Sequence, residues 1–521
     1  MANTPYSKLL SNSRLRKSSF SGRNIVLESE SDRGRLLFCP AFRRLQQKAQ
    51  VFSMEPNAAV RSRLTHSLEV SQMGRYIADS VTEKLLEHKL ATEDECKAIV
   101  TFVETACLMH DIGNPPFGHF GEAAISTWFR ECGAEAIKKS LGQIFDEKTL
   151  NTRTKAALAD FYEFDGNPQG LRIVTKLQRN TDPFGLNLTK TSIASFLKYI
   201  RQSEISSLGD VSHKINKAGC IGDFQQRKNQ SSKNQFTKKA GFFSTEAEIV
   251  KNVWNQFGYD NPQRFPLAYI MEAADDLAYC ISDLEDSIEK GLLDKQKALN
   301  EIFQQWKHLD HALKDKYYQS IDRVLGFAAD GKSDKKEIYT FIDFRTELNR
   351  IIVEYCAEQY LGNHQKILDG IAGSLLEDNS SASIILGLLK QHCREHVYGH
   401  ESVQRVELAG YTAISGLLEK YSCLLESSLD RFNCALASDK KDSSGKPIIL
   451  EGKFIALLPK NYIDVYKDDL KELNIKFPNT QSSDFLFSEW NLRAHLVVDF
   501  ISGMTDDFAM TTYRTLSGMR L

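Results

Sequence analysis

Three features of the sequence predict an all-α fold. Apolar residues recur every three or four positions over long stretches, which is the pattern of helices with one buried face. Only 12 prolines occur in 521 residues, so many helices can run without interruption. The chain is long enough for two or three domains with a sizeable buried core.

Composition restricts the class of protein before any motif is considered. The formal net charge of -2 indicates no overall attraction to nucleic acid or to membranes. The longest apolar runs, such as residues 384–389, are far shorter than the roughly 20 residues that span a bilayer. The ten cysteines are scattered without a C-x-x-C pair, as is typical of reduced thiols. We therefore expect a cytoplasmic protein without membrane spans.

The first 65 residues divide into two parts. Residues 1–30 are rich in Ser, Arg and Asn and carry no periodic apolar pattern or secretory signal, so we expect a flexible polar arm. Residues 31–65 hold seven Lys and Arg against only Asp32 and Glu55. Such a segment either supplies phosphate-binding cations to a cleft or forms a solvated basic surface.

Two amphipathic helices follow, and each brings a histidine to one end. Residues 66–88 and 98–111 both show the helical period, with His66 at the start of the first and His110 near the end of the second. A histidine there is either a core residue or a ligand. Asp111 directly after His110 favours the ligand, because an ionised carboxylate on a buried helix end needs a cation or a donor.

The next stretch breaks the helix and starts another. Gly113 allows the chain to leave the helix, and residues 114–116 (NPP) cannot continue it. A new helix near His119 would set His119 and Glu122 three residues apart on one face. A carboxylate there orients an imidazole for general acid or base work, although a pair without chemistry at a helix start gives the same pattern.

Residues 271–290 form the next strongly patterned helix. Its apolar positions lie on one face, and the opposite face carries Asp275, Tyr279, Asp283 and Asp286. Periodicity alone predicts that this acidic face meets solvent. The functional interpretation makes it one wall of a cleft, with Asp275 as a metal ligand.

Four residues from these segments form a plausible ligand set: His66, His110, Asp111 and Asp275. Two imidazoles and two carboxylates suit Mn, Fe, Co or Ni and can hold Mg, whereas structural zinc sites use thiolates. The order His, His-Asp, Asp resembles that of the HD superfamily of metal-dependent phosphohydrolases, which have all-helical cores.

Five blocks narrow the resemblance: ESDRGRLLFCPAFRRLQQKAQVF (30–52), RSRLTHSLEV (61–70), HDIGNPPFGHFGE (110–122), MEAADDLAYCISDLED (271–286) and DFISGMTDDFA (499–509). Together they closely resemble the bacterial dGTPase family, in the same order along nearly the whole chain. The resemblance implies hydrolysis of dGTP to deoxyguanosine and inorganic triphosphate by a helical, commonly hexameric enzyme. It also implies an HD-type core over 31–290 with a basic insertion near 206–240. A helical region over 291–521 would complete the substrate pocket and the oligomer contacts.

The resemblance also implies residue roles, cofactor and partners. His66, His110, Asp111 and Asp275 match the family's metal ligands, and His119 with Glu122 matches its catalytic pair. The substrate contacts that it implies are Gln50 and Tyr279 at the deoxyribose, Asp283 at the 3′-hydroxyl, Arg63 at the phosphates, and Lys238, Lys239 and Arg345. One divalent ion per subunit is expected, Mg²⁺ or Mn²⁺ with Co²⁺ as an alternative, and single-stranded DNA is an expected effector. The chain departs from the family at Glu163, where a His is common, and at Asp165, where Glu is.

Two other classes are consistent with the sequence. One is an HD phosphohydrolase that acts on other nucleotides. The other is a nucleotide-sensing or single-stranded nucleic-acid-binding protein that uses the basic segments 31–65 and 206–240. Retention of every ligand-type and acid–base residue favours catalysis.

Overall fold

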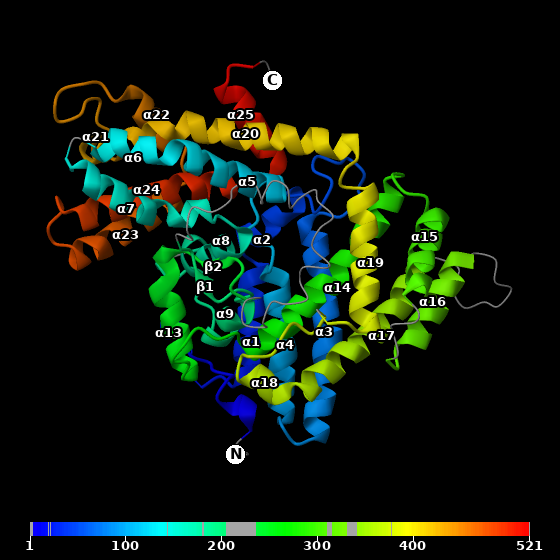
Figure 1. The fold of residues 1–521 in the computed structure, drawn as a ribbon. Coiled ribbons are helices and arrows are strands. Elements are labelled where there is room, and N and C mark those ends of the chain that lie inside the picture. The colour runs from blue at the N-terminus through cyan, green and yellow to red at the C-terminus, as the bar shows by residue number, and fades with distance from the viewer. Residues whose placement is uncertain are drawn as a thin grey trace.

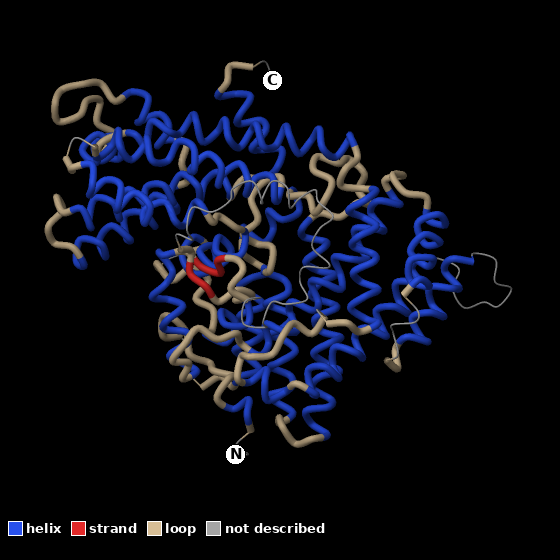
Figure 2. The backbone as a smooth tube through the Cα atoms, viewed as in Figure 1, coloured by secondary structure: helices blue, strands red, loops and turns tan. Residues whose placement is uncertain are grey.

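The computed structural model is built almost entirely of helices, which confirms the predicted all-α class (Figures 1 and 2). It describes residues 4–18, 20, 22–142, 144–179, 182–204, 236–309, 315–330, 341–376 and 378–519. Within these ranges the strands are β1 (Arg201–Gln202) and β2 (Ala240–Phe242), which form one short parallel pair.

The first half of the chain carries α1 (Ile25–Leu37), α2 (Pro40–Arg44), α3 (Arg63–Glu87), α4 (Glu93–Met109), α5 (Gly118–Trp128), α6 (Ala134–Leu141), α7 (Glu147–Tyr162), α8 (Gly166–Arg172), α9 (Lys190–Phe196) and α13 (Ala247–Phe257). Short 3-10 helices cover Pro5–Ser7, Leu45–Gln47 and Ser244–Glu246, and π-helical turns cover Phe129–Gly133 and Ile173–Leu177.

The second half carries α14 (Pro266–Glu289), α15 (Lys295–His308), α16 (Tyr318–Asp330), α17 (Phe341–Gly362), α18 (His364–Leu368), α19 (Ser381–His396), α20 (Glu401–Glu426), α21 (Leu429–Leu436), α22 (Ile449–Ala456), α23 (Lys460–Lys476), α24 (Ser483–Ser502) and α25 (Asp506–Leu516).

The centre of the molecule is the packed set α1, α3, α4 and α14. The starts of α3 and α4 are fixed by capping boxes, in which Ser62 pairs with Thr65 and Thr92 pairs with Glu95. The two helices pack along each other, and α14 lies against both (Figure 1). The three helices that carry the predicted metal ligands are therefore direct neighbours.

Two further groups of helices surround this centre. The long helix α20 crosses the top of the molecule in Figure 1 and packs on α5, α6, α24 and α25. On the other side, α19 lies between α14 and the pair α15 and α16. The helices α17 and α19, which follow residue 290, also pack on the central helices.

The N-terminal segment differs from the predicted flexible arm. Tyr6 is completely buried and its hydroxyl lies 3.0 Å from that of Tyr360. Arg14 is buried and pairs with Glu28 and Asp32. The arm prediction is wrong for these residues, because buried ion pairs order a polar segment that has no apolar period.

The predicted basic insertion near 206–240 lies outside the described residues except for 236–240. Among the described helices, none combines the length and the apolar character needed to cross a membrane.

Candidate active site

Two histidines from different helices face each other at the centre of the molecule. His66 lies in the first turn of α3, and His110 directly follows α4. Their ring centroids are 5.3 Å apart, and the side chain of His66 has no exposed surface. The helical period predicted both positions, and the packing of α3 along α4 brings the two rings together.

Asp111 and Asp275 complete the predicted set. The Oδ1 atom of Asp275, on α14, lies 3.7 Å from Nε2 of His66 and 3.5 Å from Nε2 of His110. Oδ1 of Asp111 lies 3.5 Å from the same His110 nitrogen. These separations are too long for hydrogen bonds, but they match ligand atoms that surround one ion.

The nitrogen atoms of this cluster fit a divalent metal. Both ring nitrogens of His66 and Nε2 of His110 are buried and have no hydrogen-bond partner among the described residues. Nδ1 of His110 lies 2.7 Å from the carbonyl oxygen of Cys107, so this nitrogen carries the proton and Nε2 presents its lone pair. Buried orphan nitrogens are costly unless a ligand occupies them.

Two cations keep the carboxylates of the cluster ionised. Arg63 donates to Oδ2 of Asp111 at 2.6 Å, and Lys198 donates to Oδ2 of Asp275 at 3.0 Å. Although burial opposes ionisation, Arg63 holds the pKa of Asp111 at about 2. Lys198 similarly holds the pKa of Asp275 well below its usual range against the effect of burial. Both carboxylates are therefore anionic at neutral pH, as a metal ligand must be.

Close backbone approach shapes the turn between His110 and α5. A Cβ on Gly113 would lie 2.1 Å from the carbonyl oxygen of Gly166, so this glycine is needed for space. The left-handed conformation falls instead on Phe117 and Gly118, with φ of 59° and 54°. A Cβ on Gly118 would lie 2.7 Å from the Arg63 guanidinium. The sequence pattern located the turn correctly but gave the conformational role to the wrong glycine.

Two buried residues from distant segments hold this turn in place. Nζ of Lys48 donates to the carbonyl oxygens of Asn114 at 2.6 Å and Ser502 at 2.9 Å. Asp506 accepts the backbone N–H of Phe117 at 3.0 Å and that of Ala49 at 3.1 Å. The C-terminal block 499–509 therefore braces the turn that follows His110.

The predicted proton-transfer pair is present at the start of α5. Nδ1 of His119 lies 2.8 Å from Oε2 of Glu122, whose other oxygen accepts the N–H of Gly166 at 2.8 Å. Glu122 raises the pKa of His119 through its charge and its hydrogen bond. The His119 side chain is 83% exposed, so its Nε2 is open to a substrate or water. This geometry matches an oriented general acid or base.

Basic residues lie on the His119 side of the cluster. Lys239 pairs with Asp165, and its charge reaches both Glu122 and His119. Although burial opposes ionisation, Lys239 holds the pKa of Asp165 below its usual range. Glu163, at the position where the family commonly has a His, forms a bidentate pair with Arg201 at 2.8 and 3.0 Å. The residue that differs from the family at position 163 is therefore paired with Arg201 on β1.

The acidic face of α14 is fully buried at Asp283 and Asp286 and partly buried at Asp275 and Tyr279. Asp283 and Asp286 are only 2% and 1% exposed, so the simple expectation that this face meets solvent is wrong. Tyr398 donates to Asp283 and lies 2.7 Å from the hydroxyl of Tyr279. Oδ1 of Asp283 is buried without a hydrogen-bond partner among the described residues. Burial raises the pKa of Asp283 to about 6 despite the Tyr398 hydrogen bond.

The remaining predicted substrate residues lie at different distances from the cluster. Gln50 accepts from Arg63 at 3.3 Å and so lies next to Asp111. Arg345 donates to Glu285 at 2.7 Å, and Arg61 pairs with the same carboxylate. Arg345 therefore belongs to an ion-pair network beside α14. Lys238 lies next to Lys239 in the described segment that leads into β2.

Sequence reasoning missed several residues that the fold adds to the site. Lys198 contacts Asp275 and Tyr398 contacts Asp283, and Glu407 on α20 is close enough for the charge of His119 to affect its pKa. Burial raises the pKa of Glu407 to about 7. None of these residues stands in a sequence motif. The only hint in the sequence is that carboxylates such as Asp275 and Asp283, if buried, need a cation or a hydroxyl as a partner.

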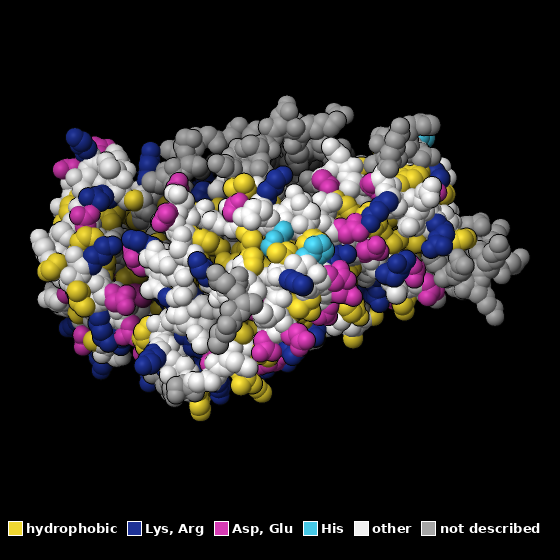
Figure 3. All heavy atoms as spheres, turned by 90° about the horizontal axis from the view of Figure 1, so that it is seen from below, with side chains coloured by type: hydrophobic (Ala, Val, Ile, Leu, Met, Phe, Trp, Pro, Cys, Tyr) yellow, Lys and Arg dark blue, Asp and Glu magenta, His cyan; other side chains and the backbone are white. Residues whose placement is uncertain are grey.

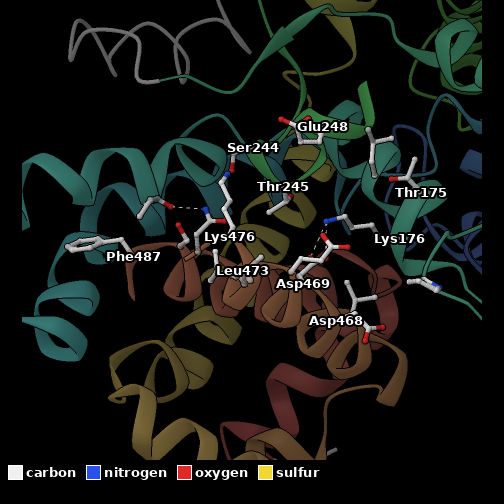
Figure 4. Close-up of a pocket in the computed structure, with 18 of the residues that line it drawn as sticks. Thr175, Lys176, Ser244, Thr245, Glu248, Asp468, Asp469, Leu473, Lys476 and Phe487 are labelled. Atoms are coloured by element: carbon white, nitrogen blue, oxygen red, sulfur yellow. Dashed lines mark hydrogen bonds and ion pairs between the residues drawn. The ribbon is translucent and has the colours of Figure 1, made fainter. Parts of the chain in front are cut away.

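A separate cavity of about 770 Å³ lies between α7, α23 and α24 and the segments around Lys176 and Ser244 (Figure 4). Several of its charged residues already pair with one another, as in Lys176 with Asp469 at 3.0 Å and Arg179 with Asp468 at 2.8 Å. This cavity is lined by none of the four predicted metal ligands, His66, His110, Asp111 and Asp275. It carries no comparable set of ligand and proton-transfer groups.

The charge on the face drawn in Figure 3 does not form a basic patch of the kind that binds nucleic acid. On the face drawn in Figure 3, basic and acidic side chains are interspersed among the coloured residues. A protein that binds nucleic acid through its backbone charge usually gathers Lys and Arg on one face.

A helical core with a His, His-Asp, Asp cluster defines the class as HD-domain proteins, and the HD domain family model matches residues 63–179. Curated deoxyguanosinetriphosphate triphosphohydrolases are similar over almost the whole chain. The protein from Salmonella enteritidis is 35% identical over 513 residues, which cover 94% of this chain and 93% of that protein. The protein from Klebsiella pneumoniae is 35% identical over 516 residues, covering 95% and 94%. The protein from Yersinia pseudotuberculosis is 35% identical over 510 residues, covering 94% and 93%. The chain belongs to the deoxyguanosinetriphosphate triphosphohydrolase family, and it is a hydrolase.

Proposed function

We propose that this protein hydrolyses dGTP to deoxyguanosine and inorganic triphosphate, with water attacking the α-phosphorus. One observation carries the proposal: His66, His110, Asp111 and Asp275 converge from three helices within a chain that is similar end to end to dGTP triphosphohydrolases. His119 and Glu122 stand as an oriented pair across the turn from this cluster.

The four clustered residues hold one divalent ion, Mg²⁺ or Mn²⁺, with Co²⁺ as an alternative. The orphan histidine nitrogens and the two ionised carboxylates support this assignment. A bound divalent ion supplies positive charge toward phosphate oxygens and makes water a stronger acid.

The chain's own cations bind the triphosphate. Arg63 and Lys198 each contact one ligand carboxylate, so a phosphate at the cluster lies within reach of both guanidinium and ammonium groups. Lys239 and Lys238 approach from the His119 side. Cations fixed before the substrate arrives stabilise the negative charge of the triphosphate, while the nucleoside 5′-oxygen leaves, without reorganisation.

His119 moves the proton. Its exposed Nε2 either protonates the 5′-oxygen as the bond to phosphorus breaks or takes a proton from the attacking water. Glu122 holds the ring in orientation and raises the pKa of His119.

The deoxyribose is held by Tyr279 and Gln50, with Asp283 at the 3′-hydroxyl. The free Oδ1 of the buried Asp283 supports this role, because a sugar hydroxyl would supply the missing donor. Tyr279 closes the 2′ side of the sugar, so dGTP is preferred to GTP.

We place the enzyme in the cytoplasm as a homo-oligomer, a hexamer by family resemblance, with single-stranded DNA as an effector.

Product analysis tests the proposal. The purified protein is incubated with each of the four dNTPs and with GTP, in Mg²⁺ or Mn²⁺, and the products are separated by anion-exchange chromatography. The expected result is deoxyguanosine and triphosphate from dGTP, with slower turnover of GTP. Release of dGMP and pyrophosphate, or equal turnover of GTP and dGTP, would refute it.

A further inference from the structure

A second cluster of metal-ligand side chains lies outside the active site, between α15 and α19. It consists of Glu301 on α15 and of His392 and His396 on α19. The two helices pack against each other, and α15 lies on the opposite side of α19 from α14 (Figure 1). None of the three residues contributes to the proposed chemistry on dGTP.

The geometry of this cluster suits one ion. Nδ1 of His392 lies 3.9 Å from Oε2 of Glu301, and Nε2 of His396 lies 3.8 Å from the same oxygen. All three ligand atoms lie within 4.8 Å of one another. Atoms that share an ion at about 2.1 Å are separated by about 3–4 Å. The side chains of Glu301 and His396 are 38% and 45% exposed, so both have room to turn toward one ion.

The buried histidine supplies an independent sign of a missing ligand. The side chain of His392 is only 1% exposed, and its Nδ1 has no hydrogen-bond partner among the described residues. Burial lowers the pKa of His392, and the neighbouring His396 lowers it further. A buried imidazole nitrogen that has no partner and lies 3.9 Å from a carboxylate oxygen is available to a metal ion.

We infer that Glu301, His392 and His396 form a second divalent-metal site, one that takes a transition ion such as Zn²⁺. Two imidazoles and one carboxylate are a ligand set of zinc sites that keep an open position for water. Mg²⁺ prefers oxygen ligands, so a set of two nitrogens and a single carboxylate favours a transition ion over Mg²⁺. The helical spacing of four residues places both histidines on one face of α19.

The site would cross-link two helices close to the substrate pocket. α19 packs on α14, and Tyr398, two residues after His396, contacts Asp283 and Tyr279. An ion at this site fixes the C-terminal end of α19 against α15. The inference does not depend on the proposed dGTP hydrolysis, because it concerns metal content.

Metal stoichiometry of the full-length protein tests the inference. The protein is stripped with a chelator, equilibrated with Zn²⁺ by dialysis and analysed for bound zinc. To isolate the second site, the same measurement is made on a chain in which His110→Ala and Asp111→Asn disable the metal site of the active site. This chain should still bind one zinc ion. Adding His396→Ala or Glu301→Gln should weaken that binding by roughly tenfold or more, since even outer-shell changes cost that much.

Three further measurements make the result decisive. His308→Ala removes an exposed histidine from the end of α15 and should leave zinc binding unchanged. Circular dichroism in chelator checks that the variants fold. The added substitutions should be tolerated because the His396 and Glu301 side chains are partly exposed. Co²⁺ in the His110→Ala/Asp111→Asn chain should give visible d–d absorption that His396→Ala abolishes. Zinc binding that is absent from the His110→Ala/Asp111→Asn chain, or that survives both His396→Ala and Glu301→Gln, overturns the inference.

Discussion

His119 is the residue on which the proposed chemistry depends most directly. It contacts Glu122 but none of the four clustered ligand residues in the described structure. His119→Ala should therefore leave metal binding unchanged and lower kcat by about 10²–10⁴, the range for a general acid or base. Steady-state kinetics with dGTP and calorimetric Mn²⁺ titration measure the two effects. His88→Ala, an exposed histidine at the end of α3, is the matched control. Full activity of the His119 variant would contradict the assignment.

The pH dependence of kcat reports on the same residue. Glu122 raises the pKa of His119, so its protonated form persists to higher pH than in a free histidine. If His119 acts as an acid, activity falls as the pH rises through this raised pKa. If it acts as a base, activity rises there instead. Glu122→Gln removes the main cause of the shift, so the corresponding limb of the pH profile should move to lower pH. A limb that stays in place in Glu122→Gln would rule out His119 as its origin.

At the scale of single residues, the sequence was most informative where side-chain chemistry is unusual for a buried position. His110 and Asp111 stand at a buried helix end, and both lie in the cluster. Lys198 and Tyr398 could not be found in this way, because lysines and tyrosines are common throughout the chain. Their roles arise only when segments far apart in sequence meet at Asp275 and Asp283.

The turn between α4 and α5 is the element that joins His110 and Asp111, in the proposed metal site, to His119. Asp506 accepts two backbone N–H groups, the buried one of Phe117 in this turn and the partly buried one of Ala49. Asp506→Ala leaves both donors unsatisfied, so the free energy of unfolding should fall by about 2–4 kcal/mol. Turnover of dGTP should fall as well, because the turn loses its anchor.

Denaturation in urea and steady-state kinetics measure these two effects. Asp507→Ala is the matched control, since Asp507 is the adjacent, exposed carboxylate in the same first turn of α25. Equal stability and turnover in the two variants would contradict the bracing role of Asp506.

At the scale of elements, periodicity predicted the helices well and their exposure less well. The helix expected over 271–290 is α14, which begins earlier, at Pro266. Its acidic face is buried because Arg61, Lys198 and Tyr398 reach it from other segments. The sequence predicts a flexible arm at the N-terminus because the ion pairs of Arg14, which order this segment, leave no periodic signal.

The oligomeric state is a prediction at the scale of the whole molecule. The family resemblance predicts a hexamer, and the exposed apolar side chains of Ile449, Leu450 and Leu457 on and next to α22 offer surface that a subunit contact would bury. Size-exclusion chromatography with light scattering should give six times the chain mass of 59.0 kDa. A mass equal to one chain at micromolar concentration would contradict the prediction.

The overall arrangement shows why some motifs could be found but not explained from sequence. The block at 499–509 resembles the family, yet it contains no metal ligand or proton-transfer pair. In the fold, Asp499 binds Arg172 and Gln169 of α8, and Asp506 braces the turn after His110. Such contacts between segments hundreds of residues apart have no local signature, so their purpose becomes clear only in three dimensions.

The position of water attack tests the central claim most directly. The protein is incubated with dGTP in H₂¹⁸O, and the products are analysed by mass spectrometry. Attack at the α-phosphorus predicts one ¹⁸O atom in the triphosphate and none in deoxyguanosine. Label in the deoxyguanosine 5′-oxygen, or label in dGMP or inorganic phosphate as the first product, would contradict the claim.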